Sequence, residues 1–236
     1  MSLLHAKEFN KKLCTSSSLS ALFDFLIKQN LGNITFSTSL GQEDQVLTHH
    51  IATQKLPIQI FTLDTGRLFQ ETYDVLDDTQ RKYKKRIHVF APNTKDVENL
   101  VVSKGPNSFY RSVENRKECC NIRKIEPLKR ALKNQNVWIT GLRKSQSENR
   151  LDLDFFSYDE SFGILKFNPL LHWSLDDVTT YLDTYNVLQN KLHKKGYVSI
   201  GCAPCTRAIE PGEDIRAGRW WWEVSKKECG LHTIKS

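Results

Sequence analysis

The sequence predicts an α/β fold in which helices flank a mostly parallel central sheet. Short runs of β-branched and aromatic residues alternate with longer stretches whose apolar residues recur at helical spacing, the pattern of βαβ units. Polar loops that contain glycine follow several of the apolar runs, and ligands of such folds bind beyond the carboxyl ends of the strands. After Val198 the chain is rich in Gly, Pro, Arg and Trp, which predicts an irregular, mobile C-terminal tail.

Four short apolar runs are the expected strands. They cover residues 34–37, 58–62, 87–90 and 137–140. Residues 141–161 are polar and irregular, which is typical of a surface loop.

Helices are expected where the apolar spacing changes from two to three or four residues. In residues 19–29, for example, Leu19, Leu22, Phe23, Leu26 and Ile27 would share one helix face. The other expected helices cover residues 44–54, 68–83, 97–102, 117–133 and 174–184. Ser174 is a good N-cap for the last of these, and Pro127 is expected either to kink the helix over 117–133 or to begin a new one.

Length and composition predict one cytoplasmic domain with an arm. The chain has 236 residues, which suits a domain over 1–212 and a tail over 213–236. It has no apolar run long enough to span a membrane and no signal-peptide pattern at its start. The formal net charge of +7 favours an anionic partner, either nucleic acid or a small phosphorylated or sulfated ligand, although a solvated basic surface explains it equally well.

Four of the six cysteines form two pairs. Cys119 and Cys120 are adjacent, and Cys202 and Cys205 form a C-x-x-C pair about 80 residues later. Two such pairs can ligate a [4Fe–4S] cluster. A zinc site, a redox-active C-x-x-C and unligated core cysteines are the alternatives. Adjacent cysteines fit one tetrahedral ion poorly, which favours the cluster. Nearby cations would offset its charge, or are merely solvated: Arg123, Lys124 and Arg207.

Three loops at predicted strand ends have the character of anion-binding loops. They cover residues 37–44, 63–67 and 140–150, and they combine hydroxyl groups, glycine and arginine. Backbone N–H groups at such a loop and at a helix N-terminus bind anions. The first loop lacks the Walker A pattern. Each loop alone is weak evidence, but the three together would form a site of nucleotide size.

The C-terminal segment carries a second group of unusual residues. Arg216 and Arg219 are spaced to grip an oxyanion, and three tryptophans follow at residues 220–222. Cys229 stands in the run Glu-Cys-Gly-Leu-His near the end of the chain, where Lys226, Lys227 and His232 would favour its thiolate. Taken alone, Cys229 is better explained as a stray tail cysteine, but together with a cluster and an anion pocket a nucleophile becomes the favoured interpretation.

Together these residues resemble the assimilatory sulfonucleotide reductases, specifically the iron–sulfur branch that reduces adenylyl sulfate. The matching pieces lie in the family's order along nearly the whole chain. They are residues 37–44, 63–67, 119–124, 140–150, 201–206, 216–222 and 228–232. The two cysteine pairs and the terminal Glu-Cys-Gly-Leu-His are specific, whereas the loops are shared with the wider pyrophosphatase-loop superfamily.

The resemblance implies an adenine nucleotide α-hydrolase fold and a [4Fe–4S] cluster on Cys119, Cys120, Cys202 and Cys205. It implies an oxidoreductase of sulfate assimilation and cysteine biosynthesis, in which Cys229 attacks the substrate sulfur. A separate thioredoxin would then release sulfite from the S-sulfocysteine. The implied substrate-binding residues are Ser37, Ser39, Gly41, Leu63, Thr65, Gly66, Lys124, Arg143, Arg150, Arg216, Arg219 and His232, of which Arg143 and Arg150 would contact the substrate or shape its pocket.

Other functions remain open at this point. The substrate is expected to be adenylyl sulfate, with the 3′-phosphorylated nucleotide or both nucleotides as alternatives. A nucleic-acid-associated metal protein would need a continuous basic face and no role for Cys229. An ATP-consuming RNA-thiolation enzyme would need a different loop at 37–44. Neither nucleic acid nor membrane is the expected partner. The oligomeric state is open, a homo-oligomer included, and Cys14 has no assigned role.

Overall fold

The structure is a computed structural model that describes residues 2–13, 17–146 and 150–223. The chain divides into two compact units. Unit 1 comprises Met1–Phe61, Val75–His88 and Leu132–Gln189. Unit 2 comprises Thr62–Asp74, Val89–Ala131 and Asn190–Ser236.

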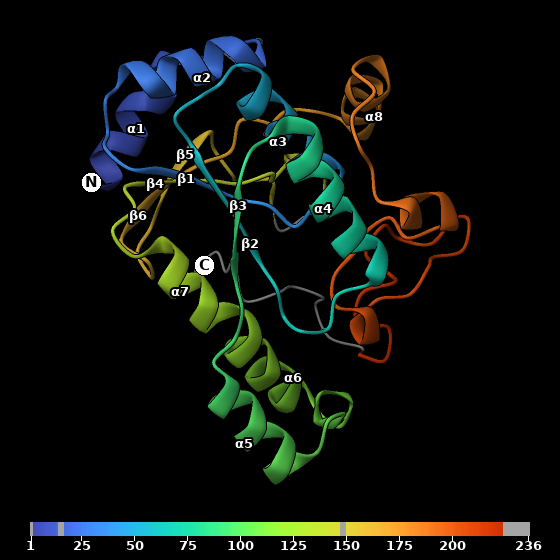
Figure 1. Ribbon diagram of the computed structural model, residues 1–236. Helices are drawn as coiled ribbons and strands as arrows, with labels where there is room; N and C mark the ends of the chain where they lie inside the picture. The colour runs from blue at the N-terminus through green and yellow to red at the C-terminus, as the bar shows by residue number, and fades with distance from the viewer. Residues whose placement is uncertain (1, 14–16, 147–149, 224–236) are drawn as a thin grey trace. The chain divides into compact units, whose positions relative to one another are not determined.

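A six-stranded sheet organises the fold (Figure 1), and its strands are β1 (Ile34–Ser37), β2 (Gln59–Leu63), β3 (Ile87–Phe90), β4 (Val137–Ile139), β5 (Phe156–Asp159) and β6 (Ile164–Phe167). Their order in the sheet is β3-β2-β1-β4-β6-β5. Strand β1 pairs in parallel with β2 and β4, β4 pairs in parallel with β6, and β5 runs antiparallel to its neighbour β6. The predicted α/β class with a mostly parallel sheet is confirmed.

The antiparallel hairpin of β5 and β6 was not expected from the sequence. Residues 141–161 had been assigned to a surface loop, and this is wrong for 156–159, which form β5. The turn between the two strands uses Gly163 at φ +62° and the Asp159 carboxylate, which accepts hydrogen bonds from two backbone N–H groups. Only Phe156 of β5 is fully buried, so the strand lacks the apolar alternation that would reveal it.

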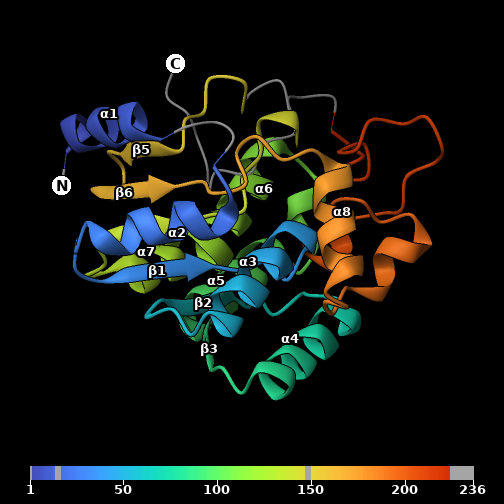
Figure 2. The same cartoon turned by 90° about the horizontal axis from the view of Figure 1, so that it is seen from above.

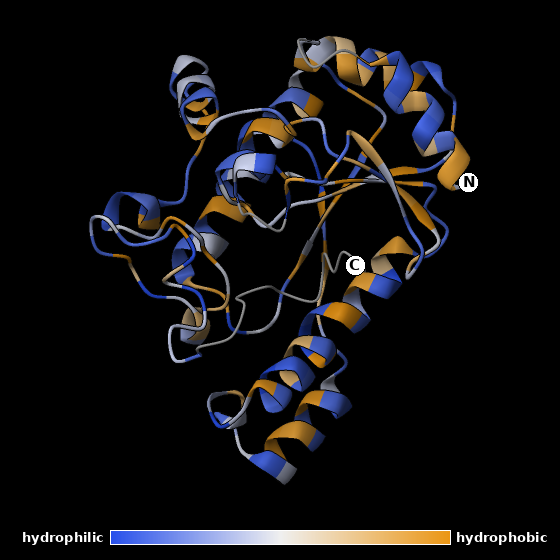
Figure 3. Cartoon of the chain, turned by 180° about the vertical axis from the view of Figure 1, so that it is seen from behind, coloured by the Kyte–Doolittle hydropathy of each residue, from blue (hydrophilic) through white to orange (hydrophobic). Residues whose placement is uncertain are grey.

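The helices assigned mainly to unit 1 are α1 (Leu3–Lys12), α2 (Leu19–Lys28), α3 (Gln42–Thr53), α4 (Gln70–Tyr83) and α8 (Leu175–Thr184). Helices α1, α2, α3 and α8 bury apolar residues in one core with the sheet. Most of the helices show hydrophobic and hydrophilic residues side by side (Figure 3). This is the amphipathic pattern on which the helix predictions rested. Ser174 begins α8 in a capping box with Asp177, which confirms the predicted N-cap.

Helix α1 was missed in the sequence and lies beside the edge strand β5 (Figure 2). Its Phe9 packs edge-on against Phe156, with 5.2 Å between ring centroids. Asn10 donates its side-chain amide to the Phe156 carbonyl and accepts from the Phe156 N–H, both at 2.8 Å. One side-chain amide therefore satisfies both backbone groups of an edge residue.

Unit 2 contains α5 (Thr94–Lys104), α6 (Val113–Cys120) and most of α7 (Glu126–Leu132), with a π-helical turn over Asn121–Ile125 between the last two. The helix expected over 117–133 is therefore part of one helical run over 113–132, in which the hydrogen bonding changes at the π-helical turn and the Glu126 N–H donates to the Asn121 carbonyl. Pro127 follows that turn directly, as the second residue of α7. Within the described residues, no helix is long and apolar enough to cross a membrane.

Candidate functional site

The loop after β1 wraps around the carboxylate of Asp44, in the first turn of α3. The backbone N–H and the hydroxyl of Ser39 both donate to Asp44 Oδ2, at 2.5 and 2.6 Å. Gly41 is the N-cap of α3, and the Ser37 hydroxyl accepts from Trp138 Nε1 at 2.8 Å. Burial raises the pKa of Asp44 to about 6, although the hydrogen bonds from Ser39 oppose the rise. The Asp44 carboxylate of α3 thus holds the loop after β1 in this conformation.

The loop after β4 meets the same carboxylate. A Cβ atom on Gly141 would lie only 2.3 Å from Asp44 Oδ1, so that position accepts glycine alone. Two of the three predicted strand-end loops, 37–44 and 140–150, therefore come together within unit 1. The third belongs to unit 2.

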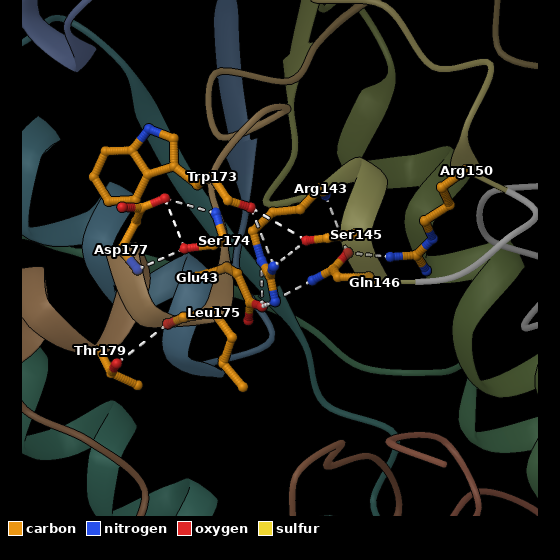
Figure 4. Close-up of polar contacts among 10 residues, drawn as sticks. All are labelled: Glu43, Arg143, Ser145, Gln146, Arg150, Trp173, Ser174, Leu175, Asp177 and Thr179. Atoms are coloured by element: carbon orange, nitrogen blue, oxygen red, sulfur yellow. Dashed lines mark hydrogen bonds and ion pairs between the residues drawn. The ribbon is translucent and has the colours of Figure 1, made fainter.

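Arg143 connects the loop after β4 to α3 (Figure 4). Its guanidinium donates to Glu43 Oε1 through Nε at 3.0 Å and through Nη2 at 2.8 Å. Its Nη1 donates to the Ser145 hydroxyl and to the Trp173 carbonyl. Its side chain is 4% exposed. Because most of its donors bond protein groups, Arg143 shapes the loop, which is one of the two roles that the sequence suggested.

Arg150 belongs to the same network. It donates from Nη1 to Gln146 Oε1, while Gln146 Nε2 donates to Glu43 at 2.9 Å. Glu43 thus accepts from both Arg143 and Gln146. It lies within the loop 37–44 that the sequence singled out, but it was not assigned a role of its own.

The turn after β2 lies in unit 2 together with the cysteines. Gly66 has φ +69°, and its N–H donates to Asp64 Oδ1 at 2.8 Å. The Thr65 carbonyl accepts from Arg123 Nη1 at 2.6 Å, and Cys202 Sγ donates to the Thr65 hydroxyl at 3.2 Å. Thr65, predicted to hold the nucleotide, is therefore also in contact with one of the four cysteines.

The four paired cysteines occupy two short segments of unit 2. Cys119 and Cys120 end α6, while Cys202 is the N-cap of a 3₁₀ turn over Ala203–Cys205 and Cys205 is its last residue. None of these four cysteines forms a disulfide bond. Cys202 and Cys205 are buried in a small core with Phe109 and Trp220, and Cys119 packs against it. These four residues with their packing partners are called the cysteine centre below.

Burial controls the thiol chemistry of the cysteine centre. It raises the pKa of Cys119, and it raises the pKa of Cys205 to about 12 with a further contribution from Cys202. Cations act in the opposite direction: Arg123 on Cys119, and Lys124 and Arg219 on Cys205. As thiols these groups are unreactive at neutral pH. A bound metal centre would be needed to hold them as thiolates.

The stretch of chain around Arg219 runs antiparallel to the stretch that follows Cys205. Thr206 forms an isolated bridge with Arg219, and the Trp220 N–H donates to the Cys205 carbonyl at 3.2 Å. Arg219 is buried, with Cζ 4.8 Å from the centroid of the Trp220 ring. A Cβ on Gly201 would lie 2.3 Å from Arg219 Nη2, so glycine makes room for the guanidinium.

The other predicted cations differ in their surroundings. Lys124 lies in the π-helical turn and is half-buried, and Arg216 is half-buried as well. The Arg207 side chain is 37% exposed and forms a bidentate ion pair with Glu213, in which Nη1 and Nη2 each donate to a carboxylate oxygen at 2.8 Å. Its charge is therefore compensated locally. Arg116 and Glu223 were not singled out by the sequence, and they form a buried ion pair.

A single-ion metal site is not present among the residues that the structure describes, where no three His, Cys, Asp or Glu side chains gather closely enough. A [4Fe–4S] cluster spreads its four cysteine ligands over four iron atoms, and the two cysteine pairs of unit 2 supply that number of ligands. In the described ranges, Arg123 Nε and Trp222 Nε1 are buried donors without a hydrogen-bond partner. They fit a group that brings acceptor atoms to the cysteine centre.

Five residues discussed above lie outside the described residues. They are Cys229 and His232, which the sequence assigned to the site, Lys226 and Lys227 beside them, and Cys14, which has no assigned role.

Comparison with known proteins gives one consistent family. Residues 33–208 match the family described as "Phosphoadenosine phosphosulfate reductase domain". The adenosine 5′-phosphosulfate reductase of Allochromatium vinosum is 51% identical over 205 residues, which cover 86% of this chain and 80% of that protein. The enzyme of the same name from Neisseria meningitidis serogroup B is 52% identical over 199 residues, covering 84% and 81%.

Solved structures agree at the level of the fold. A phosphoadenylyl-sulfate reductase from Candida auris, in a phosphate complex, superposes with a TM-score of 0.75 at 27% identity and covers 89% of this chain and 98% of its own. Yeast FAD synthetase superposes at 0.54 with 16% identity, covering 88% and 77%. The second likeness concerns the fold alone.

Proposed function

Because the chain belongs to the phosphoadenosine phosphosulfate reductase domain family, we propose that it is an oxidoreductase that reduces adenylyl sulfate to sulfite and AMP. The observation that carries the proposal is the similarity, near 50% identity over four-fifths of their length, to curated relatives named for this substrate. The two cysteine pairs in unit 2, which form no disulfide bond, support it further.

The reaction would proceed in two stages. The Cys229 thiolate attacks the sulfur of adenylyl sulfate, a Cys229 Sγ–S bond forms, and the S–O bond to AMP breaks. A thiolate of a separate dithiol protein, thioredoxin, then attacks Cys229 Sγ and expels sulfite. The second thiol of that protein resolves the mixed disulfide, so the dithiol supplies the two electrons. Cys229 belongs to the tail that we assign to residues 213–236, and the domain to 1–212.

Anionic groups of the substrate would be bound by cations. These are Lys124, Arg216 and Arg219 of unit 2, together with His232 of the tail. Arg219 supports this assignment best because its guanidinium is buried beside Cys205. Charge-assisted hydrogen bonds of this kind are about twice as strong as neutral ones.

The nucleotide would be held by the loops at the strand ends. Ser37, Ser39 and Gly41 contribute from unit 1, and Leu63, Thr65 and Gly66 from unit 2. Arg143 and Arg150 would shape the first of these sites through Glu43, as their hydrogen bonds indicate. The pre-shaped loop around Asp44 supports this role because a loop fixed before binding loses less conformational entropy on binding.

A [4Fe–4S] cluster would be held by Cys119, Cys120, Cys202 and Cys205. When bound it would supply a fixed anionic centre whose field, together with Arg123 and Arg219, tunes the electrostatics near the substrate. The hydrogen bond from Cys202 to Thr65 supports a direct link between that centre and the nucleotide turn.

The proposal is tested by purifying the protein under anaerobic conditions and measuring sulfite release from adenylyl sulfate with thioredoxin. Wild-type protein mixed with adenylyl sulfate alone should carry a sulfonate on the peptide that contains Cys229. Cys229→Ser should bind AMP normally and release no sulfite. An adduct on Cys14, or none, would contradict the role of Cys229.

The cellular setting follows from this activity. An assimilatory reductase of this kind would act in the cytoplasm, in sulfate assimilation and cysteine biosynthesis, with adenylyl sulfate and thioredoxin as its partners and without nucleic acid or membrane. Self-association into a homo-oligomer is compatible with this activity. A nucleotide-binding assay with AMP, ATP and RNA separates it from nucleic-acid-associated alternatives, because only AMP should bind tightly.

A further inference from the structure

Four side chains on four neighbouring strands of the sheet form a chain of contacts that ends at the loop after β1. Strands β5, β6, β4 and β1 lie in this order in the sheet, and all four belong to unit 1. Lys166 Nζ donates to Asp159 Oδ2 at 3.0 Å and lies 4.7 Å from the centroid of the Trp138 ring. Trp138 Nε1 donates to Ser37 Oγ at 2.8 Å. An ion pair between β5 and β6 is therefore connected to Ser37 through one indole ring.

The ion pair behind the indole ring is buried and firmly held. The side chains of Lys166 and Asp159 are 10% and 11% exposed. Burial lowers the pKa of Lys166, whereas the charge and the hydrogen bond of Asp159 raise it and so favour the ammonium form. Asp159 Oδ1 accepts from the backbone N–H groups of Ser161 and Phe162, which fixes the carboxylate. Lys166 is therefore held at one place over the Trp138 ring, where a cation and the ring face attract each other.

The contact between Trp138 and Ser37 determines which way the Ser37 hydroxyl can point. An indole N–H can only donate a hydrogen bond, so Ser37 Oγ is its acceptor. A hydroxyl group carries one proton besides its lone pairs, and that proton must point away from the donor. Within the described ranges of the chain, the Ser37 hydroxyl donates to no protein group. Since Ser37 is half-buried at the end of β1, its proton is left for a ligand of the loop.

We propose that Trp138 is a positioning residue that holds the Ser37 hydroxyl as a hydrogen-bond donor toward an acceptor atom of the nucleotide, and that Lys166 keeps the indole in the required orientation. This inference rests on the proposed role of Ser37 in nucleotide binding. A hydroxyl fixed as a donor favours acceptor atoms, such as phosphate oxygens and ring nitrogens, over amino groups. The cation over the ring also withdraws electron density from the indole, which strengthens its N–H as a donor.

A purely structural role for the same contact leads to a different expectation. A buried indole N–H requires an acceptor, and Trp138 is only 1% exposed. If Ser37 were nothing more than that acceptor, losing the N–H would change the stability of the fold and leave the affinity for a nucleotide as it was. Measuring both quantities on the same variants separates the two roles.

The first experiment measures the Kd for AMP by titration calorimetry on the full chain, purified under anaerobic conditions. Ser37→Ala should raise this Kd about tenfold, and Trp138→Phe, which keeps an aromatic ring beside Lys166, about threefold to tenfold. The double variant should bind no more weakly than Ser37→Ala, because the indole acts through a hydroxyl that is no longer there. Tyr181→Phe is the matched control. It also removes one polar atom from an aromatic side chain and breaks a 2.8 Å hydrogen bond in unit 1, to His49, and should keep the wild-type Kd.

The second experiment addresses the ion pair. Asp159→Asn combined with Lys166→Met removes both charges together, so that neither is left buried without a partner. This variant should raise the Kd for AMP about threefold in a chain that has Ser37, and should have no effect on the Kd in a chain with Ser37→Ala. An equal increase in both chains would mean that the ion pair does not act through Ser37.

Thermal unfolding of the same proteins completes the test. A lower Tm of Trp138→Phe with an unchanged Kd for AMP would overturn the inference, and so would additive losses of affinity in the double variant. If wild type binds AMP with the expected pattern among the variants but releases no sulfite, the reductase assignment fails and the positioning role of Trp138 stands. Sulfite release by wild type, together with normal AMP binding by Trp138→Phe, would show the reverse.

Discussion

At the residue scale, Arg219 is fixed with unusual completeness for a cation near the end of a chain. Gly201 leaves space for its guanidinium, Trp220 stacks on it, and Thr206 pairs with its backbone. The neighbouring Arg207 is instead exposed and neutralised by Glu213. The two arginines therefore differ in what their removal should do.

Arg219→Ala should lower kcat/KM for adenylyl sulfate about tenfold to a hundredfold, because a hydrogen bond to a charged group contributes about 1.5–3 kcal/mol. Arg207→Ala, the control, should change it by less than about threefold. Steady-state kinetics at matched iron content give the comparison. Unchanged kinetics in Arg219→Ala would leave the buried guanidinium with a structural role only.

Asp44 predicts a specific dependence of stability on pH. Its pKa is raised in the folded protein to about 6, so the folded state holds the proton more tightly than the unfolded state. The stability contributed by that proton is complete below the unfolded pKa and is lost as the pH rises through 6.

Between pH 5 and 7.5, wild type should therefore lose about 1 kcal/mol relative to Asp44→Asn, which cannot ionise. Thermal unfolding of both proteins across this range measures the difference. The Tm of Asp44→Asn relative to wild type should rise with pH. A constant offset would mean that the hydrogen bonds from Ser39 keep Asp44 ionised throughout.

Sequence reasoning found the residues of the loops but not their partners. Ser39, Gly41 and Arg143 were identified from loop composition, whereas Glu43, Asp44 and Glu223 were not selected. Acidic residues near an anion site contradict the simple rule that anions attract cations. These carboxylates hold hydroxyl, amide and guanidinium donors in position. For Glu43 and Glu223 the contacts span 100 and 107 positions of the sequence, which no local pattern reveals.

At the scale of single elements, the end of α6 and the 3₁₀ turn over Ala203–Cys205 bring two pairs of thiols into one unit. If these hold a [4Fe–4S] cluster, anaerobically purified protein should contain about four iron and four sulfide per chain. Replacing any one of Cys119, Cys120, Cys202 or Cys205 by serine should lower the iron content and the activity together. Stoichiometric zinc without sulfide would contradict this, and Cys14→Ser is the control that should change neither.

Helices with a clear apolar face were predictable to within a few residues. The helices expected over 19–29, 68–83 and 174–184 correspond to α2, α4 and α8. Helix α1 was missed because it buries only Ala6 and Phe9, which is too few for a periodic signal. The π-helical turn between α6 and α7 could not be located because each of its residues is also a good helix residue, apart from Asn121.

At the scale of the whole molecule, the open question is the choice of substrate. Adenylyl sulfate and its 3′-phosphorylated form differ by one phosphate. Relatives near 50% identity are named for adenosine 5′-phosphosulfate, and the structural relative named for the 3′-phosphorylated nucleotide is 27% identical. We therefore expect kcat/KM to favour adenylyl sulfate by about tenfold or more, with the same thioredoxin in both assays. Equal values would show a dual-substrate enzyme. A preference for the 3′-phosphorylated form would reverse the substrate assignment and leave the Cys229 chemistry intact.

The division into two units could not be predicted from the sequence. Each unit is assembled from three separate stretches of chain, and four of the five boundaries fall inside β2, α4, β3 and α7. Composition changes mark boundaries only where one unit follows another along the chain. The nearly parallel sheet was predictable because its strands alternate with helices, a property of consecutive segments.

The Asn10 amide has a consequence for behaviour at high concentration. An edge strand with free N–H and C=O groups is a template on which another polypeptide can extend the sheet. By occupying both backbone groups of Phe156, Asn10 removes one pairing position from β5, and α1 covers that edge. Helix α1 therefore hinders another polypeptide from pairing with β5. A version of the protein that lacks α1 would keep its catalytic residues but would tend to aggregate and precipitate.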